Sequence, residues 1–329
     1  MRKLLKKINP EFLQRLAGEI FAVTKELRRE TGVSYLTLLL DISLSVLNFV
    51  RPNEYRMYRF YEKSCRARNR FLTEYRKTQV CSLLNPQKYR SLFDNKNEFH
   101  QYFSEFTHRK WLFAPEVSDQ QIEDFLREQR QVIAKPHNRD RGEGVYKLCY
   151  SEVTDIKVFC ESARRDTLIL EEIIKQHPDL SSINSSSVNT VRIYTMLDKE
   201  NVPHILFANL RMGTEGTVVD NLNSGGVIAQ IDLDSGVLFT RGAQKNLQTH
   251  VKHPTSGVVL PGFQVPHWEA VKKMVLHTAT MSPKTRWVGW DVAITEQVPL
   301  LLEGNMEPGV EGTQSLSQMG VLPILQGYL

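Results

Sequence analysis

The sequence predicts an α+β protein with a helical N-terminal part followed by mixed helices and sheets. Apolar residues recur at helical spacing through residues 1–78, and from Gln131 onward short β-rich runs alternate with glycine-containing loops. The 329 residues also exceed one small domain, which predicts more than one lobe. We therefore expect a basic helical segment at 1–78, a mixed region at 79–130 and a two-lobed α+β region at 131–329.

Two helices are predicted at the start of the chain. Asn9 can cap a helix whose first residue is Pro10, and Gly32 provides a stop. The following run, 33–50, is apolar apart from Asp41 and is close to the minimum length for crossing a bilayer. We favour a packed helix over a membrane span, because most of its apolar residues share one helical face that packing would bury. The residues of that face are Leu36, Leu39, Leu40, Ser43, Leu44 and Leu47.

A third helix is predicted from Pro52 to about Lys77. Arginine and aromatic residues interleave along it, a pattern that can bind single-stranded nucleic acid. Nucleic-acid binding is the weaker interpretation, because one buried face with solvated arginines opposite explains the same pattern. The residues expected on the buried face are Tyr58, Tyr61, Cys65 and Leu72.

Charge divides the chain unevenly. Residues 1–90 hold 19 Lys and Arg against 8 Asp and Glu, whereas the remainder holds 23 against 29. A basic front can face anionic lipid, nucleic acid or an anionic glycan. The four cysteines form no CxxC pair, and the N-terminus lacks the apolar core of a signal peptide. We expect a cytoplasmic protein with reduced thiols and, as an option, peripheral contact with the inner face of the membrane through residues 1–78.

The pattern of apolar and polar residues predicts the elements that follow. Helices are expected at 95–106 and 118–129. Strands are expected at 132–136, 146–148, 168–174 running into a linker, 190–195, 204–211, 289–294 and 299–305.

Three oxygen-bearing side chains lie on the last two strands: Asp291, Glu303 and Asn305. Glu303 and Asn305 are two residues apart, so their side chains point to the same face of a strand. Mg²⁺ takes one or two carboxylates together with phosphate oxygens and water. The trio therefore predicts a magnesium site in an enzyme that handles a nucleotide triphosphate.

Cationic and glycine-rich positions precede this trio. Lys135 ends a strand and opens the polar loop 137–144, where backbone N–H groups can approach phosphate oxygens. Arg192 and Arg211 each lie within an apolar strand, and the turn 218–226 is rich in asparagine and glycine. Each position alone is more often structural than functional. Taken in order with the acidic trio, they predict a phosphate-and-metal site.

In this order the residues resemble the ATP-grasp superfamily, and within it the sugar-transfer-associated branch related to α-L-glutamate ligases. The resemblance covers about residues 85–329. The segments that carry it are VIAKPHNRDRGEGVYKL (132–148), LILEEIIKQHPDLSSINSSSVNTVRIYT (168–195), NLRMGTEGTVVDNLNSGGVIAQID (209–232) and GWDVAI with PLLLEGNMEPG (289–309). The resemblance implies the ATP-grasp fold, in which two α+β lobes clasp ATP.

The resemblance also implies how ATP would be bound. Lys135 would contact its phosphates, and a hinge near 171–175 would read adenine through its backbone. The remaining residues implied in cofactor binding are Arg141, Gly142 and Gly144 in the loop over the phosphates, Glu171, Glu172, Ile173 and Ile174 in the hinge, and Asn223 in the later turn. The loop departs from many relatives, because it lacks their second lysine; Arg139 or Arg141 are the candidates to replace it.

Catalysis and metal binding are implied at the remaining positions. Lys135, Arg192 and Arg211 would stabilise charge on the transferred phosphoryl group. The metal ligands Asp291, Glu303 and Asn305 would hold one or two Mg²⁺ ions, with Mn²⁺ as an alternative.

The implied reaction is ATP-dependent joining of a carboxylate and an amine through an acyl phosphate. The expected substrates are small molecules, such as an amino acid and a sugar or polysaccharide precursor in free, sugar-linked or carrier-linked form. Two alternatives stay open: a kinase of a small-molecule hydroxyl, and a nucleotide-binding partner of a glycan-assembly complex that docks through residues 1–78.

Overall fold

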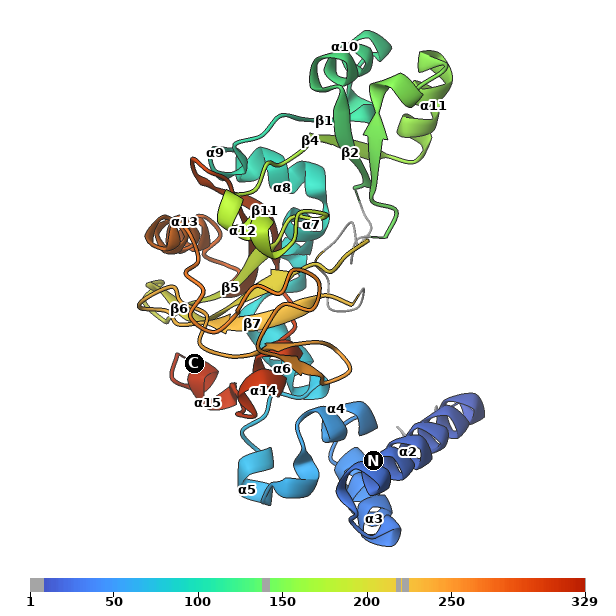
Figure 1. Ribbon diagram of the computed structural model, residues 1–329, viewed down its shortest axis with the longest axis vertical. Coiled ribbons are helices and arrows are strands. Elements are labelled where there is room, and N and C mark those ends of the chain that lie inside the picture. The colour runs from blue at the N-terminus through green and yellow to red at the C-terminus, as the bar shows by residue number, and fades with distance from the viewer. Residues whose placement is uncertain (1–8, 138–142, 217–219, 221–224, 329) are drawn as a thin grey trace. The chain divides into compact units, whose positions relative to one another are not determined.

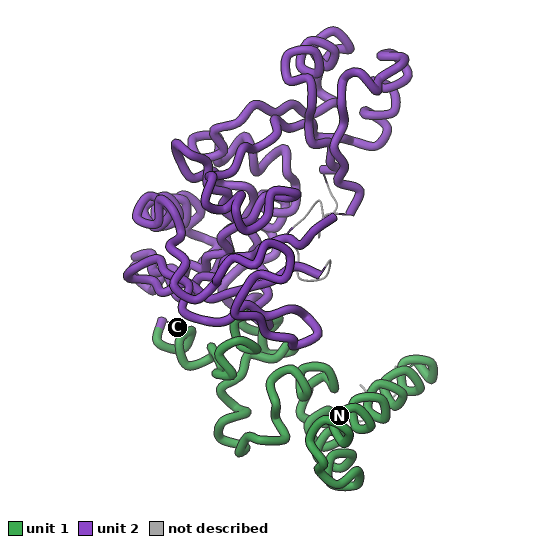
Figure 2. Tube along the Cα trace, in the orientation of Figure 1, with its two compact units in different colours: residues 1–80, 313–327 green, residues 81–312, 328–329 purple. Residues whose placement is uncertain are grey.

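The computed structural model describes residues 9–137, 143–216, 220 and 225–328 (Figure 1). The chain forms two compact units (Figure 2), namely residues 1–80 with 313–327, and residues 81–312 with 328–329. The first unit is helical, whereas the second contains both sheets.

The first unit consists of helices around an aromatic and aliphatic core. Its elements are α2 (Pro10–Thr31), α3 (Tyr35–Leu47), α4 (Pro52–Met57), η1 (Phe60–Glu62), α5 (Cys65–Arg68), the first part of α6 (Glu74–Leu84), most of α14 (Glu311–Ser317) and α15 (Leu322–Gln326). The prediction for α2 is confirmed at both ends: Asn9 accepts the backbone N–H of Glu11, and Gly32 ends the helix in left-handed backbone. The core includes Leu27 and Tyr55.

The single helix predicted over 52–77 is wrong. Arg59 adopts left-handed backbone, which no helix tolerates in its interior, and short helices follow one another instead. Tyr58 and Leu72 are buried as expected, but Cys65 is exposed. Spacing on one continuous helix therefore does not describe this segment.

The packing expected for α3 is also wrong, although the helix itself is confirmed. Its buried side carries Leu38, Ile42 and Ser45. Leu39 and Ser43 are only partly buried. The other residues of the predicted buried face, Leu36, Leu40, Leu44 and Leu47, are 57–75% exposed. Among the described residues, no helix has both the length and the apolar character that crossing a bilayer requires.

The smaller sheet of the second unit has four antiparallel strands. Their order is β1 (Trp111–Phe113), β4 (Leu168–Glu172), β2 (Gln131–Pro136) and β3 (Tyr146–Cys149). Two amphipathic helices, α10 (Asp119–Gln129) and α11 (Ile156–Arg165), bury their apolar sides with it. Short 3₁₀ turns occupy η3 (Ala114–Glu116) and η4 (Tyr150–Glu152).

The larger sheet has seven strands, again all antiparallel. Their order is β11 (Pro299–Asn305), β10 (Trp287–Ile294), β5 (Thr190–Leu197), β6 (Pro203–Met212), β7 (Val227–Ile231), β8 (Gly242–Ala243) and β9 (Thr249–His250). Helix α13 (Trp268–Met281) packs against β5 and β6. Strands β5 and β6, both predicted from the sequence, pair with each other along most of their length.

Further helices of the second unit are η2 (Gln87–Tyr89), α7 (Arg90–Asp94), α8 (Lys96–Tyr102), α9 (Ser104–Thr107) and α12 (Pro178–Ile183). The helix predicted over 95–106 is therefore divided at Phe103, whose buried ring packs against Trp290 on the larger sheet. This packing fixes the helical layer against the sheet that carries Asp291.

Candidate active site

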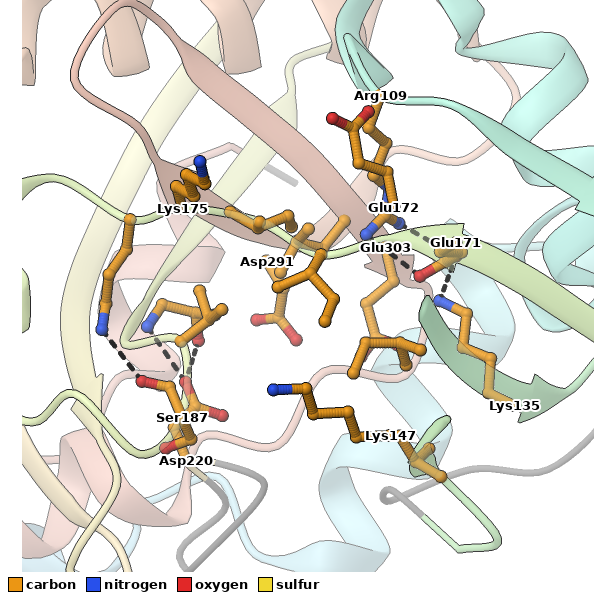
Figure 3. A pocket seen from close by; sticks show the side chains of 18 of the residues that line it. Arg109, Lys135, Lys147, Glu171, Glu172, Lys175, Ser187, Asp220, Asp291 and Glu303 are labelled. Carbon is orange, nitrogen blue, oxygen red and sulfur yellow. Dashed lines mark hydrogen bonds and ion pairs between the residues drawn. The ribbon is translucent and has the colours of Figure 1, made fainter. Parts of the chain in front are cut away.

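A cavity of about 620 Å³ is lined by residues of both sheets (Figure 3). The smaller sheet contributes β2, β3 and β4, and the larger one contributes β5, β6, β10 and β11. The charged side chains of its wall are Lys96, Arg109, Lys135, Lys147, Glu171, Glu172, Lys175, Arg211, Asp220, Asp291 and Glu303. The cavity therefore brings together most of the cations and carboxylates that the sequence singled out.

Asp291 is positioned by three neighbouring strands. The antiparallel register sets it opposite Arg192 on β5 and opposite Glu303 on β11. Nη2 of Arg192 donates to Oδ2 of Asp291 at 2.6 Å, and Nη1 of Arg211 donates to the same oxygen at 2.9 Å. Burial opposes ionisation of this carboxyl, but the two guanidinium groups outweigh burial and hold the pKa of Asp291 below its usual range. Asp291 is therefore a fixed anion.

Glu303 differs from Asp291 in its surroundings. Its side chain is 50% exposed and lies 3.9 Å from Nη2 of Arg192. Partial loss of hydration and the neighbouring Asp291 carboxylate both raise the pKa of Glu303. Two carboxylates that repel each other at a cavity wall suit a divalent cation, because Mg²⁺ needs no more than one or two carboxylates from the protein.

Asn305 is not among the residues that line the cavity. It pairs with Gly289, and its Oδ1 accepts the backbone N–H of Glu307 at 2.9 Å. No group of three or more His, Cys, Asp or Glu side chains gathers as a metal cage within the part of the chain that the structure describes. Of the three predicted metal ligands, Asp291 and Glu303 line the cavity.

The two strand arginines have different positions. Arg211 lines the cavity, whereas Arg192 does not. Arg192 lies against Asp291 through Nε and Nη2. Arg211 contacts two carboxylates, because Asp220 lies 3.3 Å from its Nη2 and Asp291 lies 2.9 Å from its Nη1. Arg211 can therefore face a ligand, while Arg192 acts on Asp291.

Lys135 belongs to a buried network on the smaller sheet. Its Nζ lies 2.5 Å from Oε1 of Glu171, which is 2% exposed. Arg109 and His100 contact the same carboxylate at 3.0 and 2.6 Å. Burial opposes ionisation of Glu171, but Arg109 and Lys135 hold its pKa well below the usual range. Burial lowers the pKa of Lys135 even though Glu171 favours the charged ammonium.

Comparison with known families decides what kind of protein carries this cavity. A family model described as sugar-transfer associated ATP-grasp matches residues 75–327, which is most of the chain. The chain belongs to the sugar-transfer associated ATP-grasp family. No curated protein matches the sequence.

Solved structures that match this ATP-grasp chain are only distantly similar. The ATP-grasp ligase PsnB, complexed with a phosphomimetic variant of its minimal precursor, Mg and ADP, has 13% sequence identity and a TM-score of 0.47. That alignment covers 77% of this chain and 66% of PsnB. D-alanyl-alanine synthetase A from Vibrio cholerae has 11% identity, a TM-score of 0.41 and coverage of 72% and 60%. D-alanine–D-alanine ligase from Bacillus anthracis, complexed with ATP, has 12% identity, a TM-score of 0.43 and coverage of 72% and 65%. The chain thus spans less than two thirds of each of these ligases.

The hinge predicted for the ATP-grasp fold links the two sheets. It begins in the last two residues of β4 of the smaller sheet and leads through α12 to β5 of the larger one. Ile173 and Ile174 line the cavity, as do Glu171 and Glu172. The Glu172 carboxylate accepts the backbone N–H of Lys110 at 3.0 Å, whereas the Glu171 carboxylate contacts Lys135.

Gly144 belongs to the described part of the predicted phosphate loop. Gly144 has φ +74°, and a Cβ there would lie 3.1 Å from Cγ of Pro136. Both observations favour glycine at this turn. Arg139, Arg141, Gly142 and Asn223 lie outside the described residues.

Sequence reasoning missed five charged residues of the cavity. Lys147 extends into it from β3 (Figure 3), and Lys96, Arg109, Lys175 and Asp220 also line it. Lys147 lies in a predicted strand whose alternation offered a signal. Asp220 lies in the predicted glycine-rich turn, where it accepts the backbone N–H of Thr190 at 3.0 Å. Lys96 and Lys175 gave no pattern that separates them from surface lysines.

Acid is expected to destabilise the protein through Glu171 and Asp291. Their folded-state pKa values lie below the ordinary values of 4.5 and 3.8. Their stabilisation is therefore present above those ordinary values and is lost as pH falls below them. Each group then lowers the free energy of unfolding by about 1.4 kcal/mol per pH unit. Denaturant unfolding from neutral pH to about pH 3 measures this loss. A free energy of unfolding that stays constant over that range would contradict the prediction.

Proposed function

We propose that this ATP-grasp protein is an ATP-dependent carboxylate–amine ligase that works through an acyl phosphate. One observation supports the proposal most: the carboxylates of Asp291 and Glu303 share a cavity with the cations of Lys135 and Arg211. Phosphoryl transfer needs such positioning and charge stabilisation rather than a side-chain nucleophile. In keeping with this, the described cavity wall includes no His or Cys.

ATP would bind with its phosphates towards Lys135 and its base towards the hinge. The lysine ammonium is a point charge suited to phosphate oxygens. The backbone of Ile173 and Ile174 would contact adenine, with Glu172 beside them. Gly144, together with Arg141 and Gly142, would cover the phosphates, and Asn223 would approach from the other loop.

Asp291 and Glu303, with Asn305 from the same strand as Glu303, would hold one or two Mg²⁺ ions or Mn²⁺ in their place. A bound cation would neutralise phosphate oxygens. Arg192 keeps Asp291 ionised and oriented, which makes it a positioning residue. Arg211 would stabilise the charge that develops on the transferred phosphoryl group.

The reaction balances without a further reactant. An oxygen of the substrate carboxylate bonds to the γ-phosphorus as the bond from phosphorus to the ADP oxygen breaks. The amine nitrogen then bonds to the carbonyl carbon, inorganic phosphate leaves with the carbon–oxygen bond, and the nitrogen loses a proton. The family description supports a sugar or polysaccharide precursor as one substrate. We propose an amino acid as the other substrate, with either one in free or carrier-linked form, and a location at the cytoplasmic face of the membrane. The support for the sugar comes from the family description alone. This support is by association.

Product analysis tests the proposal. Purified protein with ATP and Mg²⁺ is incubated with pooled amino acids and sugar acids, and the mixture is analysed by mass spectrometry. We expect ADP, phosphate and a product lighter by one water than its two parts, with no product when either pool or Mg²⁺ is omitted. A stable phosphorylated acceptor formed without any amine would instead identify a kinase.

A further inference from the structure

A stripe of leucines on α3 faces away from the core of the first unit. Leu36, Leu40, Leu44 and Leu47 lie four, four and three residues apart, so they form one face of the helix. Their exposed fractions of 57–75% are unusual for four neighbouring leucines, because single apolar residues rather than stripes are normal on a protein surface. We call these four residues the leucine face.

The leucine face carries no charge. The one ionisable carboxylate or cation of α3 is Asp41, which is turned towards the rest of the unit. Tyr55 donates to its Oδ2 at 2.6 Å, and Arg68 donates to Oδ1 and Oδ2 at 2.7 and 2.6 Å. The helix is therefore apolar on its outer side and satisfies its only charge on its inner side.

Exposed arginines bracket α3. Arg28 and Arg29 lie in the last turn of α2, just before α3, and Arg51 follows α3. Residues 9–80 hold 13 Lys and Arg against 8 Asp and Glu. An arginine can place its charge at a lipid headgroup while neighbouring apolar residues enter the acyl boundary.

We infer that the leucine face docks onto an anionic lipid bilayer, with Arg28, Arg29 and Arg51 at the headgroups. At 13 residues, α3 is too short to span a membrane but suits a helix lying in the interface. The positive charge of the unit selects anionic over neutral lipid. This inference does not depend on the proposed ligase activity.

A second copy of the chain is the less suitable occupant. Helices that pair through a leucine stripe use charged residues beside the stripe to set register and partner. On α3 the flanking positions are Thr37 and Ser43, which offer no such pairing. Two copies would also bring like charges together, which disfavours association.

Co-sedimentation of the full-length protein with vesicles tests the inference. One vesicle type contains phosphatidylcholine alone, and the other contains equal parts of phosphatidylcholine and phosphatidylglycerol. We expect binding to the second type only. Leu40→Glu/Leu44→Glu should weaken this binding at least about tenfold, because charge replaces buried apolar area. Arg28→Gln/Arg29→Gln should weaken it about fivefold per charge removed.

Leu83→Glu is the matched control, because Leu83 is an 80% exposed leucine on α6 outside the leucine face. It should bind like the wild type, and thermal unfolding should show that every variant folds. Equal binding to both vesicle types, absence of binding, or full binding by Leu40→Glu/Leu44→Glu would each overturn the inference. The wild type could instead form a dimer in analytical ultracentrifugation that is lost in Leu40→Glu/Leu44→Glu, and fail to bind vesicles. That result would assign the leucine face to a second copy of the chain.

Discussion

Glu303→Ala is expected to lower turnover about 10³-fold while the protein stays folded. Glu303 is half-exposed, so its removal leaves no buried cation without a partner. What it removes is one of the two carboxylates proposed to bind the cation, and with it the cation that would neutralise the phosphates. Rates of ADP release and titrations of nucleotide binding with Mg²⁺ measure the two effects, and both should be impaired.

Asp291→Ala would be a poorer test of the same idea. Asp291 is the shared counter-charge of Arg192 and Arg211, so its loss should cost about 3–5 kcal/mol of stability as well as activity. Glu307→Ala is a suitable control for Glu303→Ala. Glu307 lies just after the same strand, its carboxylate pairs with Arg90, and it does not line the cavity. Near-normal turnover in Glu303→Ala would contradict the metal assignment.

Arg211→Ala is expected to lower kcat about 10²- to 10³-fold and to change nucleotide affinity far less. Arg211 lines the cavity, and its proposed contact strengthens as charge develops on the transferred phosphoryl group. Steady-state kinetics give kcat and KM, and calorimetry gives the Kd of ATP separately.

Arg192→Ala provides the informative comparison for Arg211→Ala. Arg192 contacts Asp291 from outside the cavity wall, so its loss should act through the orientation and charge of Asp291. We therefore expect a raised Mg²⁺ concentration to restore part of the lost rate in Arg192→Ala but not in Arg211→Ala. Equal losses of nucleotide affinity and rate in Arg211→Ala would contradict this prediction. They would show that Arg211 contributes to nucleotide binding in the ground state rather than to the transition state.

Local pattern predicted the strands of the site well. Alternation placed Arg192, Arg211, Asp291 and Glu303 within strands, and an antiparallel sheet brings such residues together wherever register aligns them. The contacts within the site were not predictable in the same way. Whether Asp291 meets a guanidinium or faces only a cavity depends on register between strands about a hundred residues apart in sequence.

Helical packing was harder to predict from the sequence. The spacing of Leu36, Leu40 and Leu44 shows correctly that these residues share a face. It does not show which face of α3 meets α2 and α4, and the helix in fact buries Leu38 and Ile42. Periodicity shows which residues share one side of a helix, whereas burial of that side depends on partners that lie elsewhere in the chain.

Lys135 is immobilised by Glu171 before any nucleotide arrives. A free lysine side chain carries about 2 kcal/mol of rotamer entropy, which this contact removes during folding rather than during nucleotide binding. If Lys135 binds phosphate as proposed, its ammonium group would act as a stationary reference point against which a triphosphate aligns. Rigidity of this kind would favour correct placement of the phosphorus atom over tight capture of the nucleotide, because Glu171 would compete with the phosphates for the same charge.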